Sequence, residues 1–352
     1  MGRRAQTGTC MGALVELALP LLRDAECPRT GPGSKPQVPD WLLATLIMIA
    51  LLHRKKTKSA QYRYLCERRP QLAAWCGDAR FPSRATYFRR YRRAHRLYRE
   101  AVRLQGQCAI AEGVADAAEA AVDKSLLASG PPWHRQDRLA GRRPPGVDPE
   151  AAWGYSEHHG WVYGYSFEVV VSATPTSTVF PLLASCDTAR VSEPRTFLGK
   201  IDQLPAQTVV VTADSGYDAN YVGERIEYDD RQRRTGRHFL CPANPRNGRR
   251  PKTRPGHADA ARARSRQRRG QRLQFLASRR GRKLYARRKQ TVEPFNQWFK
   301  SLWELNQRVW HRGLDNNRTQ VLGGIFVYQL LVRYNHRRGH RNGRVKWILD
   351  RL

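Results

Sequence analysis

The sequence predicts an α/β protein in which a mixed β-sheet is flanked by helices and preceded by an all-helical region. Two observations support this fold class. Residues 208–212, Thr-Val-Val-Val-Thr, are β-branched and stiff at χ1, which is typical of a strand buried on both faces near the centre of a mixed sheet. Residues 1–105, by contrast, carry apolar residues in helical patterns.

The charge of the chain restricts what it can bind. Its 352 residues carry a formal net charge of +33, and arginine far outnumbers lysine. This charge is too extreme for an ordinary metabolic enzyme and indicates a polyanionic partner, for which the planar guanidinium of arginine is well suited. The length allows two domains, or one large core with an appendage.

The cysteines and the apolar runs bear on the compartment. The seven cysteines form no Cys-X-X-Cys pair and no Cys/His cluster with zinc spacing, so we expect reduced thiols in the cytoplasm. Arg3 and Arg4 precede an apolar stretch as in a signal peptide, but Glu16 and Pro20 interrupt that stretch and favour a buried amphipathic helix. The longest apolar run, residues 41–52, is too short to span ~30 Å of hydrocarbon at ~1.5 Å per residue, so no membrane anchor is expected.

Residues 1–105 are expected to form one helical domain. Asp40 is a candidate N-cap for a uniformly apolar helix that follows it. A second helical stretch, 62–76, is expected to break or kink at Pro70, and residues 77–82 are expected to form a turn. Ser83 can cap a third helix over 83–102.

The third helix is densely basic. Tyr87, Tyr91 and Tyr98 line one side of it. Its positive charge comes from Arg89, Arg90, Arg92, Arg93 and Arg96. A short turn followed by a basic helix is typical of a helix-turn-helix, in which these arginines would face DNA phosphates or base edges. A solvated basic face on a structural helix is the alternative, and the global charge favours DNA binding.

The middle of the chain predicts the strands. A short strand over 122–125 is expected to deliver Asp123 into a loop, and a long polar excursion follows over 126–160. Aromatic and β-branched residues predict strands over 161–174 and 176–187, which we expect to be antiparallel neighbours. A helix over 192–204 leads to the strand at 208–212, and a shorter strand is expected at 237–242.

The C-terminal part begins with a strongly basic stretch. Residues 231–289 contain Asp259 as their one acidic residue, so this segment is expected to be an exposed loop or an arm that becomes ordered on nucleic acid. Thr291 is the expected N-cap of the next helix, because Pro294 loses no hydrogen bond in a first turn. Another helix over 320–335 closes the core.

Three acidic residues are candidates for a shared site. Asp214 follows the strand at 208–212, Asp123 ends or follows the first strand, and Glu293 begins a helix. Their order matches a ribonuclease H-like sheet, and clustered carboxylates on a basic protein favour divalent-metal chemistry on phosphodiesters. Asp214 could instead cap a helix, and Glu293 could interact with a helix dipole. The rivals of Asp123 are Asp116, Glu119, Asp137 and Asp148.

Several motifs resemble those of the DDE transposases of bacterial insertion sequences. Residues 213–218, Ala-Asp-Ser-Gly-Tyr-Asp, look like the second-aspartate motif of that family. Residues 123–125, 132–134 and 153–165 resemble its first-aspartate region. The residues that are similar to its Tyr-Arg-Glu-Lys signature are Tyr285, Lys289, Glu293 and Lys300. The likeness covers roughly residues 119–339.

The resemblance implies a ribonuclease H-like DDE domain over 106–345, with an Arg-rich insertion at about 243–284 and a tail at 346–352. It implies cut-and-paste transposition, with Asp123, Asp214 and Glu293 holding a pair of Mg²⁺ or Mn²⁺ ions for nicking and strand transfer. The implied partners are double-stranded DNA, as terminal inverted repeats and target DNA, and further copies of the chain in a homodimer or higher oligomer. The implied location is the bacterial cytoplasm, in association with the nucleoid.

The signature around the third acid is matched with two departures. Lysine stands at 289 in place of arginine, and Tyr285 is one residue further from it than the pattern expects. The spacing from Glu293 to Lys300 matches, and seven residues are close to two turns, which places the ammonium on the face of Glu293. The DNA-contacting residues expected near the acids are Arg288, Lys289 and Lys300.

Other residues have less specific interpretations. Asp187 and Asp218 are expected in turns or caps, and Trp298 and Trp303 in the core, although an aromatic side chain near the site could hold a flipped base. The histidines that could contact DNA or carry protons are His134, His158 and His159. Two rival functions stay open: a metal-dependent nuclease without strand transfer, and a non-catalytic DNA-binding protein such as a decayed transposase acting as a repressor.

Overall fold

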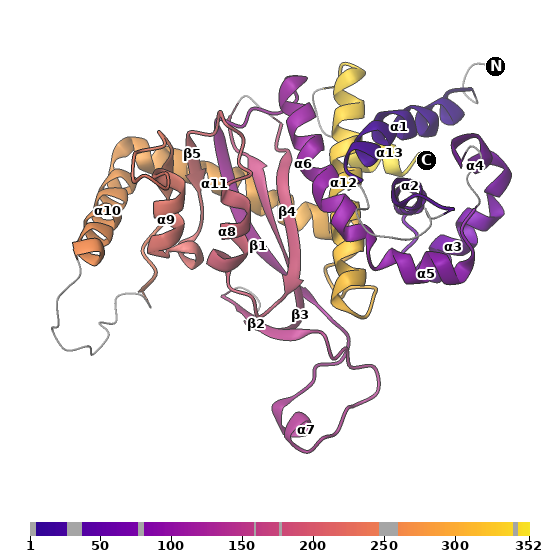
Figure 1. The fold of residues 1–352 in the computed structure, drawn as a ribbon, viewed down its shortest axis with the longest axis horizontal. Helices are drawn as coiled ribbons and strands as arrows, with labels where there is room; N and C mark the ends of the chain where they lie inside the picture. Colours follow the sequence, from indigo (N-terminus) through magenta and orange to yellow (C-terminus); the bar gives the residue numbers. More distant parts are fainter. Residues whose placement is uncertain are drawn as a thin grey trace.

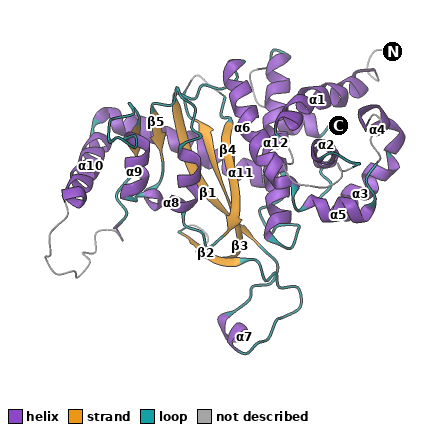
Figure 2. Ribbon diagram, in the orientation of Figure 1, coloured by secondary structure: helices purple, strands orange, loops and turns teal. Residues whose placement is uncertain are grey.

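The computed structural model describes residues 5–26, 37–76, 81–157, 160–175, 178–245, 260–340 and 344–352. A mixed six-stranded sheet lies between a group of N-terminal helices and a group of later helices (Figures 1 and 2). This arrangement confirms the α/β fold class and is consistent with a ribonuclease H-like fold. Within the described ranges, every helix is too short or too polar to cross a bilayer.

The N-terminal region is helical where it is described. Its helices are α1 (Ala5–Asp24), α2 (Asp40–Leu52), α3 (Lys58–Glu67), α4 (Arg69–Cys76), α5 (Arg84–Tyr91) and α6 (Ala94–Ala111). The uniformly apolar α2 is buried from Leu42 to Leu52, and α1 packs against it. Leu14 and Ala18 of α1 are fully buried, as expected for an amphipathic helix.

Local signals place some of the helix ends. Ser83 caps α5 as predicted, and the chain is interrupted between α3 and α4 next to Pro70. Two predictions are wrong. Asp40 is the first residue of α2 and not its N-cap, and the single helix expected over 83–102 is divided into α5 and α6. Most of the turn expected at 77–82 lies outside the described residues.

The sheet brings two parallel strands together near its centre. Its strands are β1 (Glu119–Ala128), β2 (Ala152–Ser156), β3 (Gly160–Ser172), β4 (Pro181–Thr188), β5 (Val210–Thr212) and β6 (His238–Leu240). The order is β2-β3-β1-β5-β6, and β4 also pairs with β3, antiparallel as predicted. β5 pairs in parallel with both β1 and β6, so these strands end at one edge of the sheet.

Three strand-region predictions need correction. Asp123 is not delivered into a loop, because the strand β1 already begins at Glu119, has ten residues and contains Asp123 near its middle. β5 has three residues, and Val209 before it is 48% exposed, so the valine run is not buried throughout. The excursion at 126–160 contains the end of β1, the short helix α7 (Arg135–Leu139) and β2.

Helices cover both faces of the sheet (Figure 1). On one face lies α8 (Glu193–Ile201), whose Lys200 forms a buried ion pair with Glu168 of β3, with 2.6 Å between Nζ and Oε1. On the other face lies α11 (Arg279–Leu302), whose Phe299 packs on Phe167 of β3 with 5.2 Å between ring centroids. The helix α12 (Leu314–Arg337) packs against α6 and β4 and so joins the N-terminal helices to the sheet.

The basic stretch is folded where it is described. α10 (Ala260–Ala277) and the first half of α11 come from the segment expected to be a loop or arm, and residues 246–259 lie outside the described residues. Leu284 packs with Val210 and Leu240 in a small core beside β5 and β6. The helix expected to begin at Thr291 therefore begins much earlier, and Pro294 lies inside it. The smaller helices are α9 (Asn220–Glu227) and α13 (Val345–Leu349).

Candidate active site

The pairing of β1 with β5 places two aspartates side by side. Ala121 of β1 is paired with Thr212 of β5 in a parallel register. Asp123 and Asp214 each lie two residues beyond that pair, so both stand at the carboxyl end of the pairing. Ligands bind at this edge in open α/β sheets. Asp214 also caps the short 3₁₀ turn after β5, accepting the N–H of Gly216 at 3.0 Å.

Arg288 of α11 brings the third acid to the same place. Its Nη2 lies 2.7 Å from Oδ1 of Asp123 and 3.7 Å from Oδ2 of Asp214. Its Nη1 lies 2.6 Å from Oε1 of Glu293. The Arg288 side chain is only 8% exposed. The three predicted acids therefore surround one buried guanidinium, and sequence reasoning had assigned Arg288 to DNA contacts alone.

Asn296 was missed in the sequence and holds Asp123 from the other side. Its Nδ2 donates to Oδ2 of Asp123 at 2.8 Å, so both carboxylate oxygens of Asp123 are bound. Among the described residues, Oδ1 of Asn296 and Nε of Arg288 are buried and have no hydrogen-bond partner. Asn296 follows Glu293 by three residues, a spacing that puts both on one side of a helix and could have been noticed.

Glu193 is a fourth carboxylate that the sequence did not reveal. It begins α8 on the opposite face of the sheet and lines the same cleft as Asp214. Its carboxylate packs against Gly216, where an added Cβ would lie 1.9 Å from Oε2 of Glu193. Lys124 supports this approach, because its ammonium donates to the carbonyl of Val191 just before α8.

Burial dominates the electrostatics of the acids. It raises the pKa of Asp123 to about 6, with a further upward contribution from Asp214, although Arg288 acts in the opposite direction. Burial also raises the pKa of Asp214, again against Arg288. The pKa of Glu193 is raised to about 7 by burial and by the nearby Asp214, while Lys124 opposes the rise. The cleft thus holds several carboxyl groups that favour the presence of a cation.

A cleft of about 1000 Å³ opens above these groups. Lys300 and Tyr285 line it together with the acids. Burial lowers the pKa of Lys300, and Asp123 opposes that shift. Lys289 is exposed and does not line the cleft, whereas the adjacent Arg288 reaches the acids.

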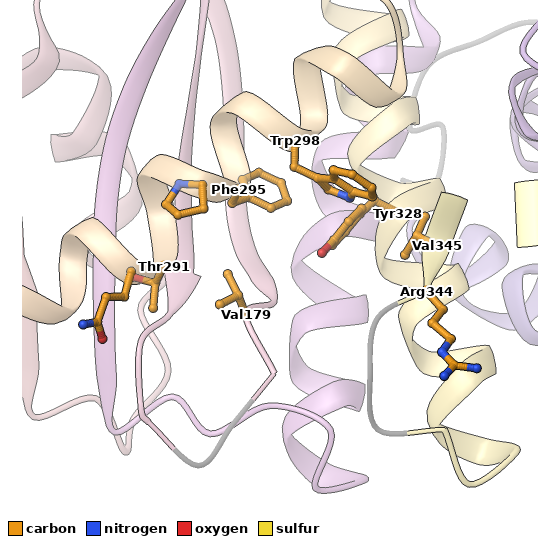
Figure 3. A pocket seen from close by; sticks show the side chains of 9 residues that line it. Val179, Thr291, Phe295, Trp298, Tyr328, Arg344 and Val345 are labelled. Atoms are coloured by element: carbon orange, nitrogen blue, oxygen red, sulfur yellow. The ribbon is translucent and has the colours of Figure 1, made fainter. Parts of the chain in front are cut away.

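The opposite side of α11 lines a smaller pocket of about 260 Å³ (Figure 3). The buried Phe295 and Tyr328 line it together with Trp298, which is 42% exposed. The expectation that Trp298 packs in the core is therefore wrong. Trp303 is buried as predicted.

The other sequence candidates lie apart from the acids. Arg90 pairs with Asp40 and is largely buried, whereas the remaining arginines of the basic helix are exposed: Arg89, Arg92, Arg93 and Arg96. Asp187 pairs with Arg318, and Asp218 pairs with Arg269. The rivals of Asp123 do not line the cleft: Asp116, Glu119, Asp137 and Asp148. His134 packs on Trp153, and His158 and His159 lie outside the described residues.

The donor chemistry of the cluster fits a divalent cation. Three carboxylates converge on the guanidinium of Arg288, and carboxylate oxygens are the ligands that Mg²⁺ and Mn²⁺ prefer. In the part of the chain that the structure describes, no group of three or more His, Cys, Asp or Glu side chains is spaced to hold a metal ion directly. The guanidinium stands between the acids and serves as a stand-in cation.

The mixed sheet with helices on both faces, and the acidic cleft at the carboxyl ends of its parallel strands, are consistent with a ribonuclease H-like fold. Residues 122–330 match the family of the transposase DDE domain. This span is more than half of the chain, and the protein belongs to this family. No curated protein and no solved structure matches the chain significantly.

Proposed function

We propose that the protein is a cut-and-paste transposase that binds the terminal inverted repeats of an insertion sequence, cleaves DNA at their ends and joins the freed ends to target DNA. The observation that carries this proposal is the convergence of Asp123, Asp214 and Glu293, from two strands and a helix, around one cationic position in a wide cleft. Family membership supports it.

Asp123, Asp214 and Glu293 would hold the catalytic metal, Mg²⁺ or Mn²⁺, as two ions. Such ions activate the attacking water or 3′-hydroxyl and stabilise the leaving oxygen of the phosphodiester. Asn296 orients Asp123 through its hydrogen bond to Oδ2. Lys300 lies in the same cleft, where its ammonium can bind a DNA phosphate beside the acids.

We assign the arginine of the signature to Arg288 and not to Lys289. Arg288 is buried among the acids, while Lys289 points to solvent. With this assignment the spacing from Tyr285 to the arginine agrees with the signature. The one extra residue then lies between Arg288 and Glu293. Arg288 would contact the phosphate of the bound strand when metal occupies the carboxylates.

The N-terminal helices and the Arg-rich segment would hold the DNA. We propose a DNA-binding domain over 1–105. Its DNA contacts would come from the exposed arginines of α5 and of the segment that follows it: Arg89, Arg92, Arg93 and Arg96. Arg90, which pairs with Asp40, would have a structural role. The DDE domain would span 106–345, with the insertion at about 243–284 gripping the DNA backbone and a tail at 346–352. Assembly as a homodimer or higher oligomer on paired ends, in the cytoplasm near the nucleoid, completes the proposal.

The test uses labelled DNA ends that carry the inverted repeats flanking the gene, a supercoiled plasmid as target, and Mg²⁺. Cleavage and joined product are expected for the wild type, and neither for Asp214→Asn, which keeps the shape of the side chain but removes its charge. Cleavage without joining would indicate a nuclease instead. Specific binding of the repeats without any cleavage would indicate a repressor, and absence of both would refute the proposal.

A further inference from the structure

A lobe of the chain projects from one end of the sheet, away from the main body (Figure 1). It comprises residues 129–151, leaves the sheet at the end of β1 and returns at the start of β2, and carries α7. At its root, Gly164 of β3 is paired with Ala128 on one side and Ala152 on the other. Neither the acids nor the DNA-binding helices proposed above include this lobe.

Buried hydrogen bonds hold the root of the lobe in place. Asp148 is 1% exposed, and its Oδ2 accepts the hydroxyl of Tyr165 at 2.6 Å and the N–H of Gly313 at 2.9 Å. Its carbonyl accepts the hydroxyl of Tyr163 at 2.7 Å. Glu150 accepts the N–H of Leu314 at 2.8 Å. The lobe is therefore tied both to β3 and to the start of α12.

Two indoles extend this support toward the tip. Trp153 of β2 donates its Nε1–H to the carbonyl of Trp133 at 3.2 Å, and Trp133 donates its own to the carbonyl of Arg142 at 2.9 Å. These bonds join the two arms of the lobe. A surface loop with this much internal support presents its tip in a fixed direction, which lowers the entropy lost when a partner binds.

The tip combines positive charge with one exposed apolar side chain. Its exposed arginines are Arg135, Arg138, Arg142 and Arg143. Asp137 is the one acid between them. Leu139 at the end of α7 is 77% exposed, more than any other large apolar side chain among the described residues. Arginines around an apolar residue on a projecting element suit DNA, where cations contact phosphates and an apolar side chain can enter the minor groove.

The lobe also lies in line with the cleft. The cleft lining follows β1 from Asp123 to Leu126 and includes the end of β2 from Tyr155 to residue 157. Five residues separate Asp123 from the end of β1 at Ala128, a length of ~17 Å at ~3.3 Å per residue. B-DNA rises ~3.4 Å per base pair, so for a duplex that runs along β1 the root of the lobe is about five base pairs from the acids.

We propose that residues 129–151 form a DNA clamp that binds the duplex about five or more base pairs from the cleavage site, with Arg135 and Arg138 on phosphates and Leu139 in the minor groove. This inference rests on the proposed function, because it needs DNA in the cleft. It adds a second contact region for the same DNA. It also gives a function to Leu139, the most exposed large apolar side chain among the described residues.

The contribution of charge is tested with the double variant Arg135→Gln/Arg138→Gln. The control is Arg338→Gln/Arg351→Gln, which replaces two exposed arginines near the C-terminus and lowers the net charge by the same amount. Binding of a long terminal-repeat duplex is measured over a range of salt concentrations. Each lost phosphate contact lowers the magnitude of the slope of log K against log salt by ~0.9. The slope of the lobe variant should therefore fall by about 1–2, and that of the control by much less.

A shorter duplex tests the position of the contact. On a duplex that ends within five base pairs of the cleavage site, the lobe variant should have the same affinity and slope as the wild type. Equal slopes for the two variants on the long duplex, or a persisting difference on the short one, would overturn the clamp.

The apolar contribution is tested with Leu139→Ala against Leu198→Ala, a half-exposed leucine on α8. Leu139→Ala should reduce DNA bending and minor-groove protection at the lobe without changing the salt slope, and Leu198→Ala should change neither. If Leu139→Ala instead dissociates an oligomer in the absence of DNA and leaves the footprint unchanged, the tip binds another copy of the chain and the clamp is refuted. Wild-type protein that binds no repeat DNA at all would refute the proposed function, whereas intact repeat binding with unchanged lobe variants refutes only the clamp.

Discussion

Replacement of Arg288 by glutamine should lower the stability of the folded protein and make that stability depend on Mg²⁺. The guanidinium lies 2.6 Å from Glu293 and 2.7 Å from Asp123, with Asp214 at 3.7 Å. Removing one partner of a buried ion cluster costs ~3–5 kcal/mol, because the opposite charges stay buried. Asp214 and Glu293 are 39% and 43% exposed, so water offsets part of the loss and we expect about 3 kcal/mol.

The assay is thermal unfolding with and without Mg²⁺ at constant ionic strength. One kcal/mol corresponds to ~2–4 °C in large domains, so Arg288→Gln should melt about 6–12 °C below the wild type without metal. A ligand at 100 times its Kd stabilises by ~2.7 kcal/mol, so saturating Mg²⁺ should return most of this difference. The wild type should gain less, since Arg288 must leave the carboxylates before a metal can bind them.

Arg287→Gln is the matched control for this experiment. Arg287 is the neighbouring arginine on α11 and pairs with Glu119, which does not line the cleft. Its loss should destabilise the protein by a smaller amount that Mg²⁺ does not restore. The reasoning is refuted if Arg288→Gln melts at the wild-type temperature without metal, or if Mg²⁺ raises the melting temperatures of both variants and the wild type equally.

Three further predictions concern stability and binding. The pKa of Glu193 is raised to about 7 in the folded state, so the charged carboxylate disfavours folding above the unfolded pKa. Glu193→Gln should therefore stabilise the protein by about 3 kcal/mol at pH 8 and by nearly nothing at pH 4, measured by urea unfolding without metal. Gly216→Ala should destabilise the protein because the new methyl group would meet Glu193, and the loss should shrink in a Glu193→Ala background; additive losses in the same urea assay would contradict the contact. Arg90→Gln should lower the melting temperature because it removes the largely buried ion pair with Asp40, whereas Arg93→Gln should weaken DNA binding at unchanged melting temperature, and the reverse pattern would exchange their roles.

The sequence indicated the position of Asp214 because a β-branched run that stops at small residues has few alternatives. The environment of Asp123 was harder to predict, since β1 begins with alanines that carry no strand signal. Ala120 and Ala121 are fully buried, and their small size suits a strand enclosed by neighbouring elements. No sequence pattern predicted that Glu193 lies at the site, because its position near Asp214 depends on how α8 packs against the turn at Gly216.

The misjudged basic stretch has a single physical cause. A segment with one acid was expected to repel itself, but the acids that compensate it lie elsewhere in the chain. Arg269 pairs with Asp218, Arg272 with Glu227 and Arg287 with Glu119, and Arg288 reaches the three acids of the cleft. A count of charges within one segment does not include the acidic partners that other parts of the chain supply.

These pairings also connect folding with the proposed chemistry. The ion pairs that hold α10 and α11 against the sheet are of two kinds. Those of Asp218, Glu227 and Glu119 do not involve the acids proposed to bind metal and can persist when DNA and metal are bound. The pairs of Arg288 cannot all persist, because a cation on Asp123, Asp214 and Glu293 would replace it. Metal binding should therefore release one arginine toward the DNA phosphates while the remaining pairs keep α11 in position, so the helix that carries Glu293 need not move for the site to become active.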